Sequence, residues 1–416
     1  MKLLIGGSPC THWSIAQTKN RETEASGIGW ELFLNYRIAR DKYKPDFFLY
    51  ENNKSMSPAI RAQITAELGV EPVLINSALV SAQNRQRLYW VGRRNPDGTY
   101  SQVPVEQPED RGILLRDILE TSTSKKGYAL DPTHAEVLNM NPSGHGMNGA
   151  VIHCDGKSRT LTTNKGEGPK IITSIRIGTI ENDANHPDHD SQQYRVYSPD
   201  GKAVTLCGNG GGLGAKTGLY AVPAGMAWRG RENGSAFEMR DDQKSNAVAA
   251  TGHQSRLVIE AVDGKQMTVY EVHGGRITIK GKEYPIKLAD GFYIIRKLTV
   301  TECKRLQTVP DTYAFPVSDT QAHKMLGNGW TVDVIAHIMS HFEGLTTEPV
   351  KVLSMYDGMS CGHIALDKLG ADVTAYYATE IDKYAIQTTQ HNYPDTVQLG
   401  DAFQVRNDDW RLGDEL

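Results

Sequence analysis

A cysteine stands in a sharp turn near the start of the chain, in the stretch LLIGGSPC at residues 3–10. The apolar run predicts a buried strand, and the two glycines and the proline predict a loop at its end. A thiol presented by such a loop can act as a nucleophile once it is ionised. Because free cysteine is also among the most buried residue types, Cys10 by itself is either a reactive group or a packed one.

Two further stretches place charged side chains at predicted strand ends. Glu51 follows the apolar run FFLY, and a carboxyl group at the mouth of an apolar sheet can serve as a proton donor. In SAQNRQRLYWVG, Gln83, Arg85 and Arg87 alternate, so we expect them to share one face of a strand. Two arginines on one face can hold a carbonyl oxygen and steady a carboxylate. The alternatives are a solvated strand end for Glu51 and a solvated edge strand for the arginines.

A fourth stretch, SMYDGMSCGHIALDKLG at residues 354–370, has a glycine-containing turn between a predicted strand and an amphipathic helix. Such a turn brings backbone N–H groups and a helix N-terminus close to a ligand. Glu380 follows Gly358 by 22 residues at the tip of the next strand, where a carboxylate can accept from both hydroxyls of a ribose, and Asp401 follows a third strand. Together these residues predict a site for an adenosine-containing cofactor.

The elements that position these residues alternate between strand and helix. We expect strands at 2–7, 46–52, 72–80 and 87–92, with helices near 30–38 and 58–68, the second bounded by Ser57-Pro58 and Gly69. Helices are expected again at 299–307 and 331–342, and strands at 350–358, 373–382 and 396–402. This alternation predicts an α/β fold with a largely parallel sheet.

The middle of the chain, from about residue 115 to 290, is rich in Gly, Asn, Thr and Ser and has short β-type runs. Similar Gly-rich stretches begin at Asp155, Asp200 and Asp242, which predicts a hairpin-like unit that recurs three times. The alternative is a decorated β-domain whose glycines only close its hairpins.

The composition is that of an ordinary globular protein, because 39% of the 416 residues are hydrophobic and 23% are charged. The length predicts two domains, or one domain with an inserted module. No apolar run is long enough to span a membrane and no signal peptide is visible, so we expect a cytoplasmic protein. The five scattered cysteines include no CxxC pair, which argues for a reducing compartment and against a zinc site. A formal net charge of −4 neither requires nor forbids a nucleic-acid partner.

The four stretches occur together with LTVTECKRLQTVPDTY and MLGNGWTVDVIAHI, and in combination they resemble the cytosine-C5 DNA methyltransferase family. The resemblance implies a Rossmann-like methyltransferase sheet with an inserted β-rich target-recognition domain. It implies transfer of a methyl group from S-adenosyl-L-methionine to C5 of a cytosine flipped out of double-stranded DNA. Such an enzyme fits a bacterial restriction-modification system, with a restriction endonuclease as partner, or a phage that protects its own DNA. The oligomeric state is not indicated.

The resemblance also implies a role for each matched residue. Cys10 is the nucleophile that adds to C6 of the cytosine, Glu51 donates to N3 and the exocyclic amine, Arg87 contacts the base carbonyl, and Arg85 supports it. For the cofactor it implies that Tyr356 lies against the adenine, Glu380 on the ribose and Asp401 on the adenine amine. It places Gly358 beside the methionine part and Asn328 near the methionine end. The other residues implied at the cofactor site are Pro9, Trp330, Gly362 and Ile381. For DNA contacts we expect Ser8, Asn52 and Gln83, and, in the Gly-rich repeats, Thr160, Asn164, Thr205 and Asn209.

The order of the motifs departs from the family pattern, in which the cofactor motifs come first. Here they come last, and joining Leu416 to Met1 restores the usual run into the cysteine loop. We therefore expect a circular permutation with Met1 and Leu416 close in space. The expected parts are residues 1–114 as the catalytic half of the methyltransferase domain, 115–295 as the target-recognition domain, 296–345 as return helices and 346–416 as the cofactor-binding half.

Three residues also depart from the family pattern. Thr11 stands where Gln is usual, Asn53 where Val is usual, and Trp330 where many bacterial members have a small apolar residue. Asn53 is either a tolerated substitution packed under the loop or, with Lys54, a contact for a substituted methyl group such as carboxymethyl on the donor.

Three other functions compete with DNA methylation. An RNA cytosine methyltransferase shares the catalytic set but usually lacks a long recognition insert. An inactive DNA-binding protein needs none of the catalytic residues. A dehydrogenase leaves the cysteine loop unexplained, and its GxGxxG motif is absent.

Overall fold

The computed structural model describes residues 1–13, 21–114 and 299–412 and, between 115 and 298, residues 117–118, 206, 274–275 and 281 and thirteen strands. The chain divides into two compact units. The first consists of Met1–Ser81, Arg85–Gly112 and Cys303–Leu416, and the second of Ala82–Asn84 and Ile113–Glu302.

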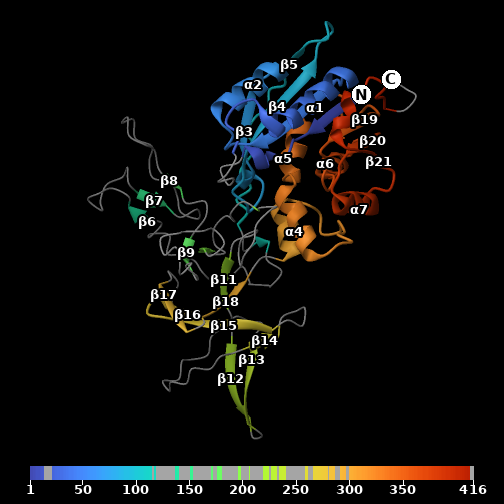
Figure 1. Ribbon diagram of the computed structural model, residues 1–416. Helices are drawn as coiled ribbons and strands as arrows, with labels where there is room; N and C mark the ends of the chain where they lie inside the picture. The colour runs from blue at the N-terminus through green and yellow to red at the C-terminus, as the bar shows by residue number, and fades with distance from the viewer. Residues whose placement is uncertain are drawn as a thin grey trace. The chain divides into compact units, whose positions relative to one another are not determined.

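The first unit is built on a sheet with the strand order β21-β20-β19-β1-β2-β4-β3, in which β5 also pairs with β4 (Figure 1). Its strands are β1 (Lys2–Gly6), β2 (Phe47–Asn53), β3 (Pro72–Asn76), β4 (Gln86–Arg94), β5 (Tyr100–Gln102), β19 (Val350–Met355), β20 (Val373–Thr379) and β21 (Val397–Gly400). Neighbouring strands from β21 to β2 are parallel, whereas β4 runs antiparallel to β2 and β3. The carboxyl ends of β1 and β2 therefore share an edge of the sheet with the amino end of β4.

The centre of this sheet is a topological switch point. From β19 the chain continues outward to β20 and β21, and from β1 it continues outward in the other direction to β2. In open α/β sheets, ligands bind outside the carboxyl ends of the strands at such a point. A ligand-binding site is therefore expected at the loops that follow β1 and β19.

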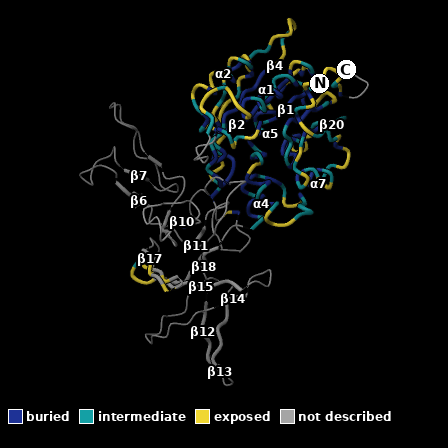
Figure 2. Tube along the Cα trace, viewed as in Figure 1, coloured by how far each residue is buried: buried dark blue, intermediate teal, exposed yellow. Residues whose placement is uncertain are grey.

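Helices cover both faces of the sheet. The helices of the described residues are α1 (Gly27–Tyr43), α2 (Pro58–Leu68), α3 (Val300–Leu306), α4 (Asp319–Asn328), α5 (Val332–Met339), α6 (Cys361–Leu369) and α7 (Lys383–Asn392), with the 3-10 turns η1 (Cys10–His12), η2 (Ser77–Leu79) and η7 (Ala402–Arg406). On one face α1, α2 and η7 pack in a single cluster with side chains such as Leu4 and Phe48. On the other face α6 lies against Ile5, and Phe342, just after α5, stacks on Phe47 at 4.7 Å between ring centroids. Figure 2 shows the strands of this unit as its buried interior.

Local signals account for the best-defined helices. In α2 the Ser57 side chain accepts from the N–H of Ile60, Pro58 occupies the first turn, and Gly69 ends the helix with φ of +75°. The buried positions of α2 include Ile60 and Ile64, as their spacing predicts. The expected strands and helices of this unit are confirmed apart from their ends.

Two expectations about its elements were wrong or incomplete. The strand expected at 72–80 ends at Asn76, where the side chain caps the turn η2. Helix α4 was not expected, although the spacing of its buried residues Ala322, Met325 and Leu326 is a helical signal.

The regular structure described in the second unit is β-sheet, as the composition predicts. Its strands are β6 (Glu136–Asn139), β7 (Ala150–Ile152), β8 (Lys170–Ile171), β9 (Arg176–Thr179), β10 (Arg195–Tyr197), β11 (Leu219–Pro223), β12 (Met226–Arg231), β13 (Gly234–Met239), β14 (Val258–Glu260), β15 (Gln266–His273), β16 (Arg276–Ile279), β17 (Lys282–Pro285) and β18 (Gly291–Arg296). One sheet has the order β17-β16-β15-β18-β11-β10-β9, and β14 pairs with β15. The Gly-rich stretches that begin at Asp155, Asp200 and Asp242 lie mostly outside the described residues. Among the described helices of the chain, none is long and apolar enough to cross a membrane.

Candidate active site

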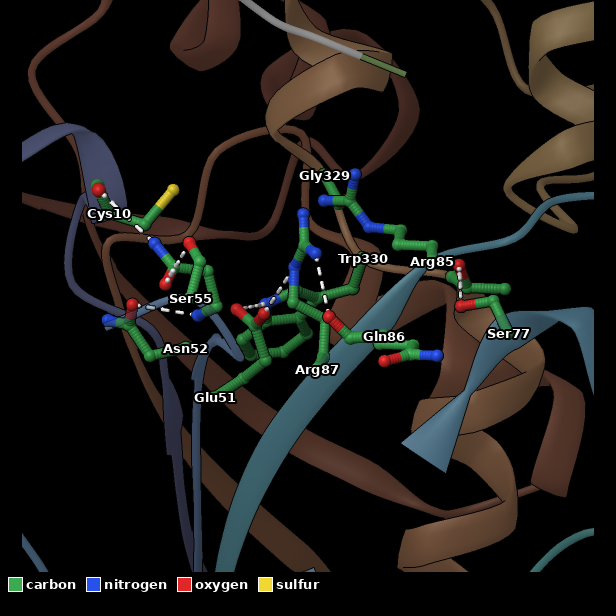
Figure 3. Close-up of polar contacts among 12 residues, drawn as sticks. Cys10, Glu51, Asn52, Ser55, Ser77, Arg85, Gln86, Arg87, Gly329 and Trp330 are labelled. Carbon is green, nitrogen blue, oxygen red and sulfur yellow. Dashed lines mark hydrogen bonds and ion pairs between the residues drawn. The ribbon is translucent and has the colours of Figure 1, made fainter. Parts of the chain in front are cut away.

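Three chain segments bring the predicted catalytic residues to one edge of the sheet (Figure 3). Cys10 begins the turn η1 after β1, Glu51 lies in β2, and Arg87 lies in β4 opposite Asn53. Since the carboxyl ends of β1 and β2 coincide with the amino end of β4, these residues meet although they are far apart in sequence. The edge lies beside the switch point of the sheet, where a ligand is expected.

The loop that carries Cys10 is fastened by polar side chains of β2. Asn52 Nδ2 donates to the backbone oxygen of Ser8 and to the Tyr50 hydroxyl, each at 3.1 Å, and Ser8 Oγ lies 2.7 Å from that hydroxyl. Asn53 Nδ2 donates to the backbone oxygen of Cys10 at 3.3 Å. Cys10 itself is partly exposed, whereas the supporting side chains are buried. A partly exposed thiol on a fixed loop is suited to react with a substrate.

The Glu51 carboxylate is held on both of its oxygens. Arg87 Nε lies 3.1 Å from Oε1, and Trp330 Nε1 donates to Oε2 at 2.9 Å. Gly7 passes close to the same group, because a Cβ at Gly7 would lie 2.8 Å from the backbone oxygen of Glu51 and 2.9 Å from Oε2. The side chain of Glu51 keeps 11% of its surface exposed. The carboxylate is therefore oriented by the protein and still accessible to a ligand.

Arg85 is buried and bonded to a different loop. It donates to the backbone oxygen of Gly327 in the last turn of α4 at 3.3 Å and to that of Gly329, in the connection from α4 to α5, at 2.9 Å. Burial is the main cause that lowers the pKa of Arg85, to about 10, and the neighbouring charge of Arg87 adds to it. Arg85 therefore stays charged at neutral pH and acts on the backbone of this loop.

Gln83 and Arg85 precede strand β4, so the expectation that Gln83, Arg85 and Arg87 share one strand face stays a prediction. Strand β4 begins at Gln86, so only Arg87 belongs to it. The two arginines turn to different partners, and Gln83 is a buried residue counted with the second unit. The first residues of the stretch form a bend and a bridge before the strand begins.

The contacts of Asn53 favour one of its two interpretations. Its Nδ2 is bonded to the Cys10 loop, and its Oδ1 accepts from Ser55 Oγ at 3.1 Å. Lys54 Nζ donates to Gln86 Oε1 at 2.6 Å. Both ends of the Asn53 amide are thus engaged within the protein, which favours a residue that packs under the loop.

A second group of polar atoms lies where β19 and β20 end. The N–H of Gly358 donates to Glu380 Oε2 at 2.9 Å, and Glu380 Oε1 accepts from the N–H groups of Ile381 and Asp382, each at 2.7 Å. Gly358 has φ of +60°, and nothing lies within 4 Å of the position that its Cβ would take. Ile381 is 74% exposed. An open turn, a fixed carboxylate and an uncovered apolar side chain suit a ligand that is polar at one end and flat and apolar at the other.

Three other residues predicted for the cofactor are exposed in this unit, namely Pro9 and Asp401 in loops and Asn328 at the end of α4. Asp401 also caps η7 by accepting from the N–H of Phe403 at 3.0 Å. Tyr356 is mostly buried, and its hydroxyl donates to the backbone oxygen of Leu32 at 2.7 Å. Its aromatic ring is thereby fixed at the end of β19.

Two residues predicted for the cofactor have other contacts. Gly362 is buried in α6, where a Cβ would lie 2.2 Å from Ile5 Cδ1, so the missing side chain lets the helix approach β1. Trp330 directs its indole N–H to Glu51. The structure thus gives Gly362 a packing role and connects Trp330 to the catalytic edge.

Asp357 lies beneath the turn that contains Gly358. It accepts from Ser354 Oγ at 2.6 Å, from the Tyr376 hydroxyl at 2.8 Å and from the Ser360 hydroxyl. Burial raises the pKa of Asp357 to about 6. This carboxyl group ties the turn to β20 and α6 and titrates close to neutral pH.

Of the residues predicted for DNA contact, the three that the structure describes, Ser8, Asn52 and Gln83, are buried. Ser8 and Asn52 are bonded to each other and to Tyr50, which favours a role in holding the loop over contact with DNA. Thr160, Asn164, Thr205 and Asn209 lie outside the described residues.

Sequence reasoning missed the roles of Gly7 and Tyr50. The second glycine of GGSPC marked Gly7 as a turn residue, but its closeness to Glu51 has no sequence signal. Tyr50 lies in a buried strand, where an aromatic ring is expected to pack in the core. Only its hydroxyl contacts the loop that carries Cys10, through Ser8.

Comparison with known proteins agrees with this geometry. A profile of the C-5 cytosine-specific DNA methylase family matches residues 1–343. The orphan methyltransferase M.SPRI of Bacillus phage SPR is 26% identical over 406 residues, covering 81% of each chain. The type II methyltransferase M.HpaII of Haemophilus parainfluenzae is 24% identical over 345 residues, covering 80% of this chain and 69% of that one.

Among solved structures, the methyltransferase EhMeth of Entamoeba histolytica has a TM-score of 0.37 and 11% identity, with 82% of this chain and 76% of that chain covered. A TM-score this low does not establish a common fold, and membership of a family is shown by the profile match over residues 1–343. The chain belongs to the C-5 cytosine-specific DNA methylase family, whose members transfer a methyl group from S-adenosylmethionine to C5 of cytosine in DNA.

Proposed function

We propose that Cys10, as a thiolate, attacks C6 of a cytosine in double-stranded DNA. The observation that carries the proposal is the meeting of Cys10, Glu51 and Arg87 at one edge of the sheet. Addition forms a C–S bond at C6 and moves a ring electron pair to C5, which becomes nucleophilic enough to take a methyl group. Loss of the C5 proton and cleavage of the C–S bond then restore the aromatic ring and free the thiolate.

Glu51 binds the polar edge of the cytosine in this mechanism. Its carboxyl group is already oriented by Arg87 and Trp330, so with a proton on one oxygen it donates to N3, and with the other oxygen it accepts from the exocyclic amine, without reorganising as Cys10 adds. Arg87 contacts the base carbonyl with its remaining donors. Arg85 supports the site indirectly, because its guanidinium is bonded to backbone oxygens.

The ends of β19, β20 and β21 fit S-adenosylmethionine, which supplies the methyl group as an electrophile on positively charged sulfur. Glu380 keeps free acceptor positions for the ribose hydroxyls beside its three N–H contacts. The exposed Ile381 covers the adenine, and Asp401 accepts from the adenine amine. The open turn at Gly358 and the exposed Asn328 leave room for the methionine part.

We also propose that the methyltransferase fold is circularly permuted. Strand β19, from near the end of the chain, pairs in parallel with β1 from its start, and Leu412 packs in the same cluster as Leu4. The family profile ends at residue 343, just before β19. Residues 1–114 and 346–416 are then the two halves of one domain, joined by 296–345. The end of the chain lies outside the described residues, so the proximity of Met1 and Leu416 stays a prediction.

The second unit is the part we assign to sequence recognition. Residues 115–295 would read base edges in the major groove of duplex DNA, where each base pair presents a distinct pattern. A stacked base cannot reach Cys10, so the target cytosine must leave the helix at a cost of about a few kcal/mol. A restriction endonuclease of the same specificity is a candidate partner, on the example of the type II relative.

Methyl transfer from S-adenosylmethionine to unmodified duplex DNA tests the proposal, with product nucleosides identified by mass spectrometry. Wild type should form 5-methylcytosine, and Cys10→Ala should form none while it keeps the wild-type melting temperature. An RNA transcript of the same sequence should not be methylated. Product formation by Cys10→Ala, or transfer to the transcript alone, would refute the proposal.

A further inference from the structure

Arg85 and Arg87 are connected to the Glu51 carboxylate by two different sets of contacts. Arg87 reaches Oε1 directly, at 3.1 Å from its Nε. Arg85 donates to the backbone oxygen of Gly329 at 2.9 Å, and the next residue, Trp330, donates its indole N–H to Oε2 at 2.9 Å. Figure 3 shows these side chains side by side at the edge of the sheet. Each oxygen of the carboxylate is therefore held through a different arginine.

The loop that carries Trp330 is fixed on both sides of this residue. Before it, the backbone oxygen of Gly329 also accepts from Gln307 Nε2 at 3.3 Å. After it, Thr331 Oγ1 donates to Gln307 Oε1 at 2.8 Å and lies 2.8 Å from Ser77 Oγ. Gln307, Thr331 and Ser77 are all buried. Buried and satisfied hydrogen bonds of this kind give a loop one conformation, so the direction of the Trp330 indole is set by the fold.

We propose that Trp330 is a positioning residue for Glu51 and that Arg85 acts on Glu51 through Trp330. The inference rests on the role proposed for Glu51 in the reaction. An indole N–H and a guanidinium can only donate, so each fixes one oxygen of Glu51 as an acceptor. Glu51 then meets the cytosine edge in a single orientation, which lowers the reorganisation needed as charge develops on the base.

This role differs from contact with the cofactor, and the kinetics of a single variant separate the two. Trp330→Phe keeps an aromatic ring and removes only the N–H donor and the second ring. Trp410→Phe is the matched control, because Trp410 is a partly buried tryptophan that packs on the core cluster of the same unit. We expect kcat of Trp330→Phe to fall about tenfold to 150-fold, the effect expected from losing a hydrogen bond to a charged group. The KM values for S-adenosylmethionine and DNA should stay unchanged, and Trp410→Phe should match wild type. A raised KM for S-adenosylmethionine with unchanged kcat would overturn the proposal.

Two double-mutant cycles test whether Trp330 acts on Glu51 and Arg85 acts through Trp330. In a Glu51→Gln background, Trp330→Phe should slow single-turnover transfer by less than about twofold, because its partner is no longer a carboxylate. Arg85→Met should slow transfer alone, and adding Trp330→Phe to it should cause little further loss. If Glu51→Gln is too slow to compare, the Arg85 pair decides. Losses that multiply would refute the proposal.

Wild type and Cys10→Ala are measured beside these variants, with their melting temperatures. A wild type that transfers no methyl group refutes the proposed function. Multiplying losses in an active, folded series refute only the role of Trp330.

Discussion

Replacing Gly7 with alanine should disturb Glu51 without changing any residue proposed to touch the substrate. The added Cβ would stand 2.8 Å from the backbone oxygen of Glu51, 2.9 Å from its Oε2 and 3.5 Å from Trp330 Nε1. Non-bonded carbon contacts are most favourable at about 3.5–4.0 Å, so two of these distances are too short. The nearest atom belongs to the backbone of the buried strand β2, which cannot turn aside as a surface side chain could. The loop before Cys10 or the carboxylate must therefore move.

The size of the effect follows from these contacts. Overpacking of a well-packed site costs about 1–3 kcal/mol of unfolding free energy. If the carboxylate moves enough to lose one of its two donors, the lost hydrogen bond to a charged group corresponds to about 1.5–3 kcal/mol. In a rate this is about tenfold to 150-fold.

Gly69→Ala is the matched control for this prediction. Gly69 has φ of +75° at the end of α2, and nothing lies within 4 Å of the position of its Cβ. Its replacement strains the backbone by about 1–2 kcal/mol and reaches no other residue. Urea unfolding and single-turnover methyl transfer should show both variants destabilised and only Gly7→Ala slowed. A Gly7→Ala enzyme with the wild-type rate would refute the reasoning, whatever its stability.

Three further predictions address the loop, the buried carboxyl group and the order of the chain. Asn53→Val introduces the usual family residue and removes the hydrogen bond to the backbone oxygen of Cys10. We expect it to lower the free energy of unfolding in urea by about 0.5–1.5 kcal/mol, with 5-methylcytosine still the product by mass spectrometry. A changed preference for the methyl-donating cofactor would contradict this. The pKa of Asp357 is about 6 in the folded protein against 3.8 for the ordinary group, so the folded state binds this proton more tightly than the unfolded chain. Stability should therefore fall by about 2 kcal/mol as the pH rises from 4 to 7, relative to Asp357→Asn, and parallel stability profiles of the two proteins would contradict it. A chain in which residues 346–416 precede Met1 should melt at the wild-type temperature and transfer methyl groups, and failure to fold would exclude the proposed permutation.

The elements of the first unit could be predicted because their signals are local. In α2, the cap, the first-turn proline, the apolar spacing and the terminal glycine all lie within thirteen residues that agree with one another. Strands such as β2 are short apolar runs buried on both faces, which is typical of a central strand in an α/β sheet. These elements needed no information from distant parts of the chain.

The site was harder to predict because its contacts join distant segments. Arg85 and Gly329 are 244 residues apart, and Glu51 and Trp330 are 279 residues apart. The motifs showed which side chains could react, but periodicity says nothing about the partners of a long side chain. The alternation of Arg85 and Arg87 gave no sign that Arg85 donates to the backbone of Gly327 and Gly329.

The two departures from the family pattern at Asn53 and Trp330 can be understood from the same contacts. Each places a hydrogen-bond donor where family members often have an apolar residue. A donor in a buried place costs free energy unless it finds an acceptor. The acceptors it finds are the backbone oxygen of Cys10 for Asn53 and the carboxylate of Glu51 for Trp330. A hydrogen-bond donor introduced beside a catalytic residue either stays unsatisfied or bonds to that residue. The side chains of Asn53 and Trp330 both bond to a catalytic residue. They are therefore the positions at which its rate should differ most from that of relatives with apolar residues there.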